Sequence, residues 1–269
     1  MLKCLKHWLG LSRTSAAIPP QLWETVKARL PFLAWLPPQF EARLRSLSAE
    51  FLTEKEFYGA HGLKLTDEMM LSIAAQACLP VLRSGMGAYR DWVGVVVYPG
   101  DFVVPRHDTD DDGVVHEYED ELIGETWPGG PVLVSWFDET LPGVNVIIHE
   151  FAHKLDMEND GGGDANGLPR LPAGMSQAAW AEAFSAAYVR FCAQVDADEE
   201  TALDPYAAEH PAEFFAVALE AFFGAPTALR TAFPAVYAQL ATYYAFDPAA
   251  GESKQKRKAN SVADIRKEL

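Results

Sequence analysis

The stretch Val144-Asn-Val-Ile-Ile-His-Glu-Phe-Ala-His-Lys-Leu155 decides the fold of this chain. Its apolar residues are spaced as in a buried helix, and His149 and His153 lie four residues apart, so their imidazoles project from one face. Two imidazoles in this arrangement can bind one metal ion, and Glu150 can hold a water bound to that metal. Because buried polar side chains need partners, we expect a metal-binding helix here. The alternative is a core helix whose histidines bond only to backbone.

Short elements are expected before this helix. The apolar spacing between Pro19 and Glu56 predicts two helices separated by prolines, and residues 66–83 read as a further helix. The runs Trp92–Tyr98 and Val132–Phe137 are short and rich in β-branched residues, which is typical of buried strands. We expect a peptide to bind alongside the second of these strands as an added strand.

Helices are expected after it over 178–195, 211–224 and 235–245. The whole pattern predicts one α+β domain over residues 18–250, mainly helical, with a small sheet beside the His149–His153 helix. Residues 1–17 are expected to form an N-terminal tail, and the basic residues 251–269 a C-terminal tail.

Composition excludes several classes of function. The 269 residues carry a net charge of −16, and residues 1–17 and 252–269 each contribute +3, so the body between them is near −22. An acidic body argues against direct nucleic-acid binding. No apolar run reaches the length of a membrane span, and the N-terminus lacks the continuous apolar segment of a signal peptide. The three cysteines show no spacing typical of a disulfide framework or a thiolate zinc site.

Two imidazoles and a carboxylate are a donor set that suits zinc, and a catalytic zinc usually has three protein ligands. The metzincin class would place Gly at 156 and His at 159, where this chain has Asp156 and Asn159, so that class is excluded. A carboxylate from a later helix remains. Glu213 is favoured because Pro211 places it in the first turn of an otherwise apolar helix. Glu220, two turns further on, is left open as the ligand or as a brace for a ligand, and Glu209 is a weaker alternative.

A second motif, Asp108 to Glu119, matches several positions of an EF-hand calcium loop. An EF-hand needs a helix on each side, whereas Val103-Val104-Pro105 precedes this segment and Gly124 follows it. We therefore expect a solvated acidic loop here.

The motifs together resemble a known family. His149 to Asp156 (HEFAHKLD), with Tyr206 to Phe223 (YAAEHPAEFFAVALEAFF), is similar to the Mlc titration factor A family of zinc peptidases, and the likeness covers most of the chain. Tyr206 lies seven residues before Glu213, and two phenylalanines follow Glu213; both features also resemble the catalytic domain of anthrax lethal factor. Lys154 departs from the strictest zincin pattern, which has an uncharged residue there, but it agrees with this family.

The resemblance implies a zincin-like fold of the gluzincin type. It also implies one Zn²⁺ per chain, held by His149, His153 and Glu213, with Glu150 as the general base and Tyr206 as an assisting hydroxyl. Family members are cytoplasmic, show aminopeptidase-like activity and bind the repressor Mlc. The expected function is therefore a zinc-dependent hydrolase of peptides that also binds an Mlc-like repressor. The alternative is a non-catalytic protein that sequesters a repressor and uses the zinc site for structure or modulation.

Overall fold

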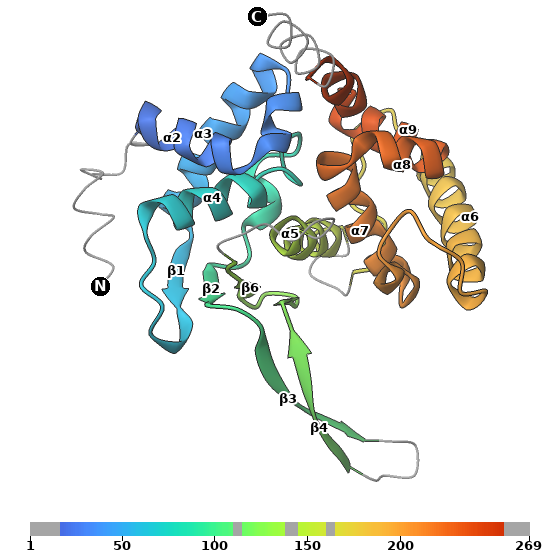
Figure 1. Ribbon diagram of the computed structural model, residues 1–269, viewed down its shortest axis with the longest axis horizontal. Helices are drawn as coiled ribbons and strands as arrows, with labels where there is room; N and C mark the ends of the chain where they lie inside the picture. The colour runs from blue at the N-terminus through green and yellow to red at the C-terminus, as the bar shows by residue number, and fades with distance from the viewer. Residues whose placement is uncertain (1–16, 110–114, 138–144, 160–164, 256–269) are drawn as a thin grey trace, which may run out of the picture.

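Helix α5 (Val146–Met157) lies between two groups of helices in the computed structural model (Figure 1). The structure describes residues 17–109, 115–137, 145–159 and 165–255, with the backbone alone over 104–121. The groups are α2 (Pro20–Arg29), α3 (Pro38–Glu54) and α4 (Asp67–Ala77) on one side, and α6 (Gln177–Asp196), α7 (Pro211–Gly224), α8 (Pro226–Ala232) and α9 (Pro234–Tyr244) on the other. This is the mainly helical α+β architecture that the sequence predicts.

A small mixed sheet lies beside α5. Its strand order is β1 (Glu56–Gly59), β2 (Gly94–Tyr98), β6 (Val132–Ser135) and β5 (Gly124–Thr126). The first three strands are parallel, and β5 runs antiparallel to β6. Strands β3 (Phe102–Thr109) and β4 (Val115–Leu122) form a separate antiparallel ribbon that stands away from the body (Figure 1).

Local sequence explains where the two helices of the site begin. Asn145 caps α5, because its Oδ1 accepts the Ile148 N–H at 3.0 Å. Pro211 occupies the first turn of α7, and His210 caps that helix by accepting the Ala212 N–H at 3.2 Å. Most residues of both helices are buried, and the burial of their apolar side chains drives the packing of one helix against the other.

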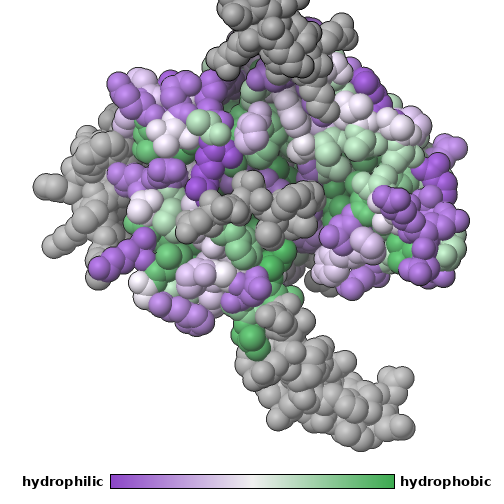
Figure 2. Space-filling view, viewed as in Figure 1, coloured by the Kyte–Doolittle hydropathy of each residue, from purple (hydrophilic) through white to green (hydrophobic). Residues whose placement is uncertain are grey.

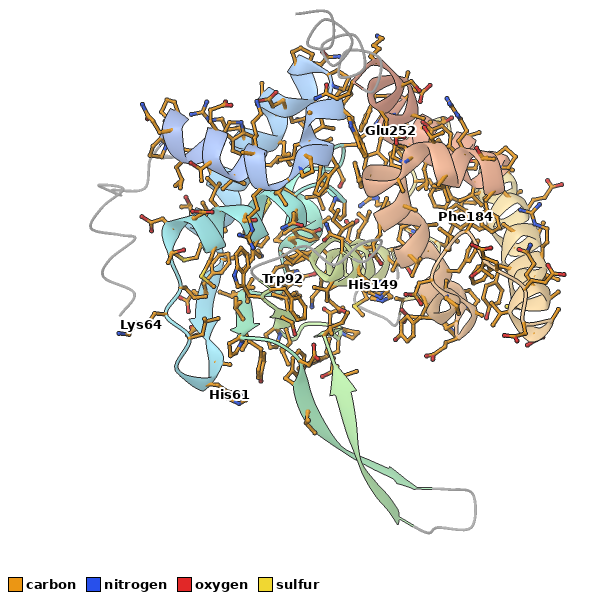
Figure 3. The ribbon with its side chains drawn as sticks, viewed as in Figure 1. His61, Lys64, Trp92, His149, Phe184 and Glu252 are labelled. Carbon is orange, nitrogen blue, oxygen red and sulfur yellow. The ribbon has the colours of Figure 1, made fainter. Side chains whose placement is uncertain are left out.

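Four large aromatic side chains fix α5 against the first group of helices. Phe51, Tyr89, Trp92 and Phe151 contact one another with ring centroids 5.5–6.3 Å apart, and Trp92 is labelled in Figure 3. The Tyr89 hydroxyl donates to the Ala77 carbonyl at 2.8 Å. This cluster therefore joins α3, α4 and α5 in one core.

Lys154 is buried on the side of α5 that faces the sheet. Its Nζ donates to the carbonyls of Trp127 and Gly130 at 2.8 and 2.9 Å and lies 5.2 Å from the ring centroid of Trp92. Burial lowers the pKa of Lys154 to about 8, and the nearby charge of Lys55 acts in the same direction. A charged residue is accepted at this position because it holds the turn between β5 and β6 against the helix.

The expected helices lie where the pattern places them, although α4 ends at Ala77 rather than near residue 83. Residues 78–84 form turns, which suits the proline at position 80. Strand β5, strand β1 and helix α8 were not expected from the sequence. They are three, four and seven residues long, too short for a clear periodicity.

Two expectations about the strands need correction. Strand β6 lies between β2 and β5, so the expected peptide-binding edge over Val132–Phe137 was wrong, and β5 forms the edge of the described sheet instead. The segment 108–119 lies in the β3–β4 ribbon, so strands rather than helices flank it and the EF-hand context is absent. Residues 110–114 lie outside the described part.

The expected boundary between the domain and the C-terminal tail, after residue 250, falls inside a helical segment, 248–255. Glu252 in this segment is buried, and its carboxylate accepts the Thr227 N–H at 3.1 Å. Residues 251–255 therefore pack with the body, while residues 1–16 and 256–269 lie outside the described part. Among the described helices, none combines the length and apolar character needed to cross a bilayer.

Candidate metal centre

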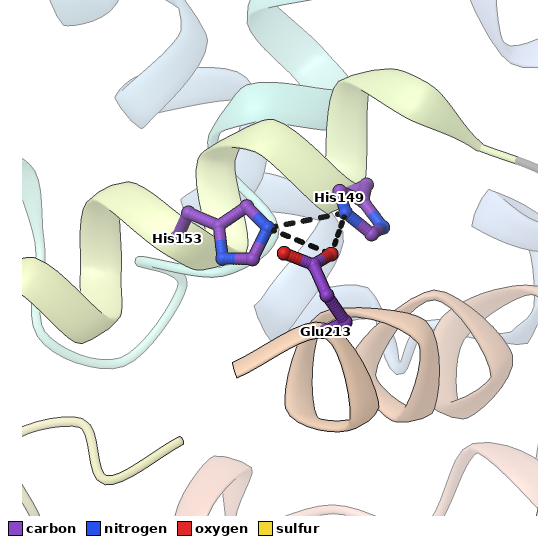
Figure 4. A group of neighbouring side chains, drawn as sticks. All are labelled: His149, His153 and Glu213. Atoms are coloured by element: carbon purple, nitrogen blue, oxygen red, sulfur yellow. Dashed lines mark hydrogen bonds and ion pairs between the residues drawn. The ribbon is translucent and has the colours of Figure 1, made fainter. Parts of the chain in front are cut away.

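Three side chains converge where α5 faces α7 (Figure 4). The Nε2 atoms of His149 and His153 lie 3.1 Å apart. Glu213 Oε2 lies 2.9 Å from the first nitrogen and 3.3 Å from the second. The two histidines come from successive turns of α5 and the glutamate from the first turn of α7. The structure thus brings together the three residues that the family resemblance implies as ligands, and Figure 3 shows His149 at this junction.

Glu220 contacts the other face of the first histidine. Its Oε1 lies 2.8 Å from His149 Nδ1, and its Oε2 accepts the Asn145 N–H at 2.5 Å. The two oxygens of this buried carboxylate are therefore engaged on the side of the ring away from the convergence point. Of the two roles left open by the sequence, this geometry is that of a brace. Glu209 is exposed and precedes α7, and His210 serves as the cap of that helix.

The donor set fits a divalent metal such as zinc. Two imidazole nitrogens and one carboxylate oxygen, all within 4.8 Å of one another, match the ligand types of catalytic zinc sites. Burial alone would lower the pKa of His149, but the Glu213 and Glu220 carboxylates outweigh it and raise that pKa to about 10. The two histidines in turn hold the pKa of Glu213 well below its usual range, against the effect of burial.

Glu150 lies next to this group and is 5% exposed. Burial raises its pKa to about 7, although the charges of the two histidines oppose the shift. A carboxylate that titrates near neutrality is suited to general-base chemistry.

Gly124 at the edge of the sheet touches Glu150. A Cβ on this glycine would lie 2.5 Å from Glu150 Oε1 and 2.5 Å from a Val146 methyl group. Only a residue without a side chain lets β5 approach α5 so closely. The Glu150 side chain is therefore held directly against the backbone of the edge strand.

Tyr206 lies in the short 3-10 helix η4 (Pro205–Ala208), just before α7. Its side chain is 46% exposed, and its ring centroid lies 6.0 Å from that of His149. Asp204 caps this turn by accepting the Tyr206 N–H at 3.0 Å. The tyrosine, which the resemblance implies as the assisting hydroxyl, thus stands beside His149 on the solvent-exposed side of the centre.

A cavity of about 230 Å³ adjoins the centre. His149, Glu150 and Glu220 form its polar wall, and Tyr206 and Asp204 also line it. The remaining lining residues are Leu122, Ile123, Gly124, Val146 and Val217. Glu150 and His149 therefore face a space that a small ligand group can enter.

Comparison with known proteins agrees with this geometry. Residues 6–245 match the model of the glucose-regulated metallopeptidase family M90. The chain belongs to this M90 family. It is 38% identical over 241 residues to Mlc titration factor A of Yersinia pestis and, equally, of Yersinia pseudotuberculosis, covering 87% of each chain. It is 37% identical over 253 residues to the uncharacterised protein slr2042 of Synechocystis, covering 90% of both chains.

Two residues that contact the M90 site could not be predicted from the sequence. Gly124 lies in a three-residue strand, and its contact with Glu150 depends on how closely that strand approaches α5. Asn145 looks like an ordinary helix cap, yet it also donates its backbone N–H to Glu220 and its side-chain amide to Gln76 Oε1 at 2.8 Å. Its position directly before a buried helix was the one available clue.

Removing the brace from the M90 site is expected to weaken metal binding. In Glu220→Gln the amide keeps the shape of the side chain but removes the charge that favours a proton on His149 Nδ1. Outer-shell partners of this kind typically contribute about 10- to 100-fold in metal affinity. Competition with a chromophoric chelator measures the change, and Glu182→Gln on the surface of α6 is the control. An unchanged affinity would show that the carboxylate does not orient His149.

Metal loading of this M90 chain is expected to release a proton. The pKa of about 10 means that His149 is protonated at pH 7 in the metal-free protein, and a histidine must be neutral to bind a metal. Zinc affinity should therefore rise with pH from neutrality toward pH 10. Calorimetry at pH 7 in two buffers of different ionisation enthalpy should count about one proton released per zinc bound. A count near zero would mean that His149 is already neutral. His61→Gln, far along the chain from the centre, should leave the count unchanged.

Proposed function

We propose that this chain is a zinc-dependent peptidase that acts on short peptides in an aminopeptidase-like manner. The observation that supports this function is the presence of two kinds of group at one cavity. His149, His153 and Glu213 supply three ligands, and the separate carboxylate of Glu150, with a pKa raised to about 7, lines the same cavity as His149. A purely structural zinc site usually has four protein ligands and needs no base.

Bound zinc would supply an activated water and a positive charge near the peptide carbonyl. Glu150 takes the proton of the attacking water and passes it to the leaving amine. The Tyr206 hydroxyl, at the open side of the centre, donates to the carbonyl oxygen as negative charge develops on it. Glu220 keeps His149 in the orientation and tautomer that leave its Nε2 free for the metal.

Strand β5 offers a place for the peptide backbone. Ser135 donates its N–H to the Ile123 carbonyl at 2.8 Å, so residue 123 faces β6. Because successive backbone groups alternate in direction along a strand, the N–H and C=O of Gly124 point to the open edge. A peptide added along this edge would lie against Glu150, which Gly124 touches.

Metal analysis combined with a cleavage assay tests this function. The purified protein is expected to contain one zinc per chain and to cleave amino-acid anilides and short peptides. A chelator should abolish cleavage, and added zinc should restore it. Zinc-loaded protein that cleaves no member of an anilide and peptide panel would contradict the peptidase assignment.

A regulatory role is the second candidate, and the names of the relatives favour it. Relatives at 38% identity are called Mlc titration factor A. We propose that this chain binds an Mlc-like transcriptional repressor in the cytoplasm as well as cleaving peptides. A pull-down with such a repressor tests the binding. If binding is independent of catalysis, the Glu150→Gln protein should bind as well as the natural one.

A further inference from the structure

The cavity beside the centre has an apolar wall that the reaction itself does not use. Leu122 and Ile123 come from the end of β4 and the residue after it, Val146 from the first turn of α5, and Val217 from α7. Val146 and Val217 are 8% and 6% exposed. Four aliphatic side chains from three parts of the fold thus line a space of about 230 Å³. On the face shown in Figure 2, apolar side chains also gather at the root of the ribbon.

The position of the cavity indicates which substrate residue lies nearest to it, the residue before or the residue after the scissile bond. Its polar wall contains His149 and Glu150, while His153 and Glu213 do not line it. In the proposed function Glu150 delivers a proton to the leaving amine, so that amine must approach the Glu150 carboxylate. The residue that carries the amine therefore has its side chain closest to this cavity.

The charges around the cavity argue against a charged side chain. Glu220 has both oxygens engaged, by His149 Nδ1 and the Asn145 N–H, so it offers little to a cationic group. Asp204 also lines the cavity, but it is exposed to solvent and one of its oxygens accepts the Tyr206 N–H, so it too adds little. Glu150 is needed for proton transfer, and the three carboxylates would repel an acidic group. Burial of an apolar side chain against the aliphatic wall is the remaining favourable interaction.

We propose that this cavity is the specificity pocket for the residue immediately after the scissile bond, and that it takes a branched aliphatic or aromatic side chain. The inference rests on the proposed peptidase function and adds a substrate class to it. Val217 sets the depth of the pocket, since it is a buried side chain on α7 one turn beyond Glu213. Gly124 keeps the pocket open to β5, because a Cβ there would strike Glu150 and Val146.

Turnover of a peptide series tests the pocket. Peptides that differ only after the scissile bond are expected to be cleaved with kcat/KM about 10- to 100-fold higher for Leu or Phe than for Gly, and with no gain for Lys or Asp. Val217→Phe should reverse the order of Phe and Ala, and Val217→Ala should increase the preference for Phe. Val189→Phe, at a 67% exposed position on α6, should keep the natural preference.

A binding measurement separates failure of the pocket from failure of the peptidase function. Hydroxamates bearing Gly, Leu or Lys side chains are titrated into zinc-loaded protein by calorimetry, which needs no turnover. Tighter binding of the leucine compound, weakened in Val217→Phe at unchanged zinc content, supports the pocket even if no peptide is cleaved. Equal affinities, a preference for lysine, or no effect of either Val217 variant would overturn it.

Discussion

Glu150→Gln is expected to reduce turnover of the zinc-loaded protein by about 10²- to 10⁴-fold, the usual contribution of a general base. The amide has the same shape but cannot accept the proton of the attacking water. Zinc content should be unchanged, because the three ligand atoms come from other residues. Steady-state kinetics on one good substrate, with metal analysis of the same sample, measures both effects.

The variant also has a stability signature. The folded-state pKa of Glu150 is about 7 against an ordinary 4.5, so the metal-free fold binds a proton that the unfolded chain has lost. Stability of the natural protein should therefore fall as pH rises from 4.5 to 7 through this group. That contribution should be missing in Glu150→Gln. Glu158→Gln, at the end of the same helix, is the matched control, and appreciable turnover by Glu150→Gln would remove Glu150 from the role of base.

Glu213→Ala is expected to cause the second large effect, a loss of zinc affinity. Outer-shell changes typically cost about 10- to 100-fold, and removal of one of three direct ligands should exceed that range. The two histidines would also lose the carboxylate that lies 2.9 and 3.3 Å from their Nε2 atoms. Zinc titration against a competing chelator measures the change.

The matched control for this variant is Glu209→Ala, which alters an exposed carboxylate four residues earlier on the chain. Its zinc affinity should equal that of the natural protein. Full retention of affinity in Glu213→Ala would transfer the third ligand position to another carboxylate, with Glu220 the first to examine. Loss of affinity with retained folding, judged by circular dichroism, agrees with direct ligation.

The sequence predicted the two helices of the site because each carries a long, consistent apolar pattern with a clear start. It could not decide between Glu213 and Glu220, which lie two turns apart on one face of α7. The decision depends on how far α7 is displaced along α5, and that displacement follows from packing between residues more than sixty positions apart. In the structure one carboxylate meets Nε2 of His149 and the other meets Nδ1.

The edge strand was missed for a different reason. The three residues of β5, Gly124–Thr126, have no alternating pattern, and their strand conformation exists because β6 pairs with them. β-structure of this length is set by its partner rather than by its own side chains. The expected peptide-binding edge was consequently placed one strand too far into the sheet.

The hydrogen bonds around His149 also bear on the order in which the protein is assembled. The Gln76 amide of α4 donates to Ser72 O and accepts from Asn145, whose N–H reaches Glu220, which meets the His149 ring. Three helices are thus joined through protein groups alone. The conformational entropy of these side chains is therefore lost when the chain folds, not when a metal binds. A zinc finger is unfolded until its metal binds, whereas we expect this chain to fold in the absence of metal.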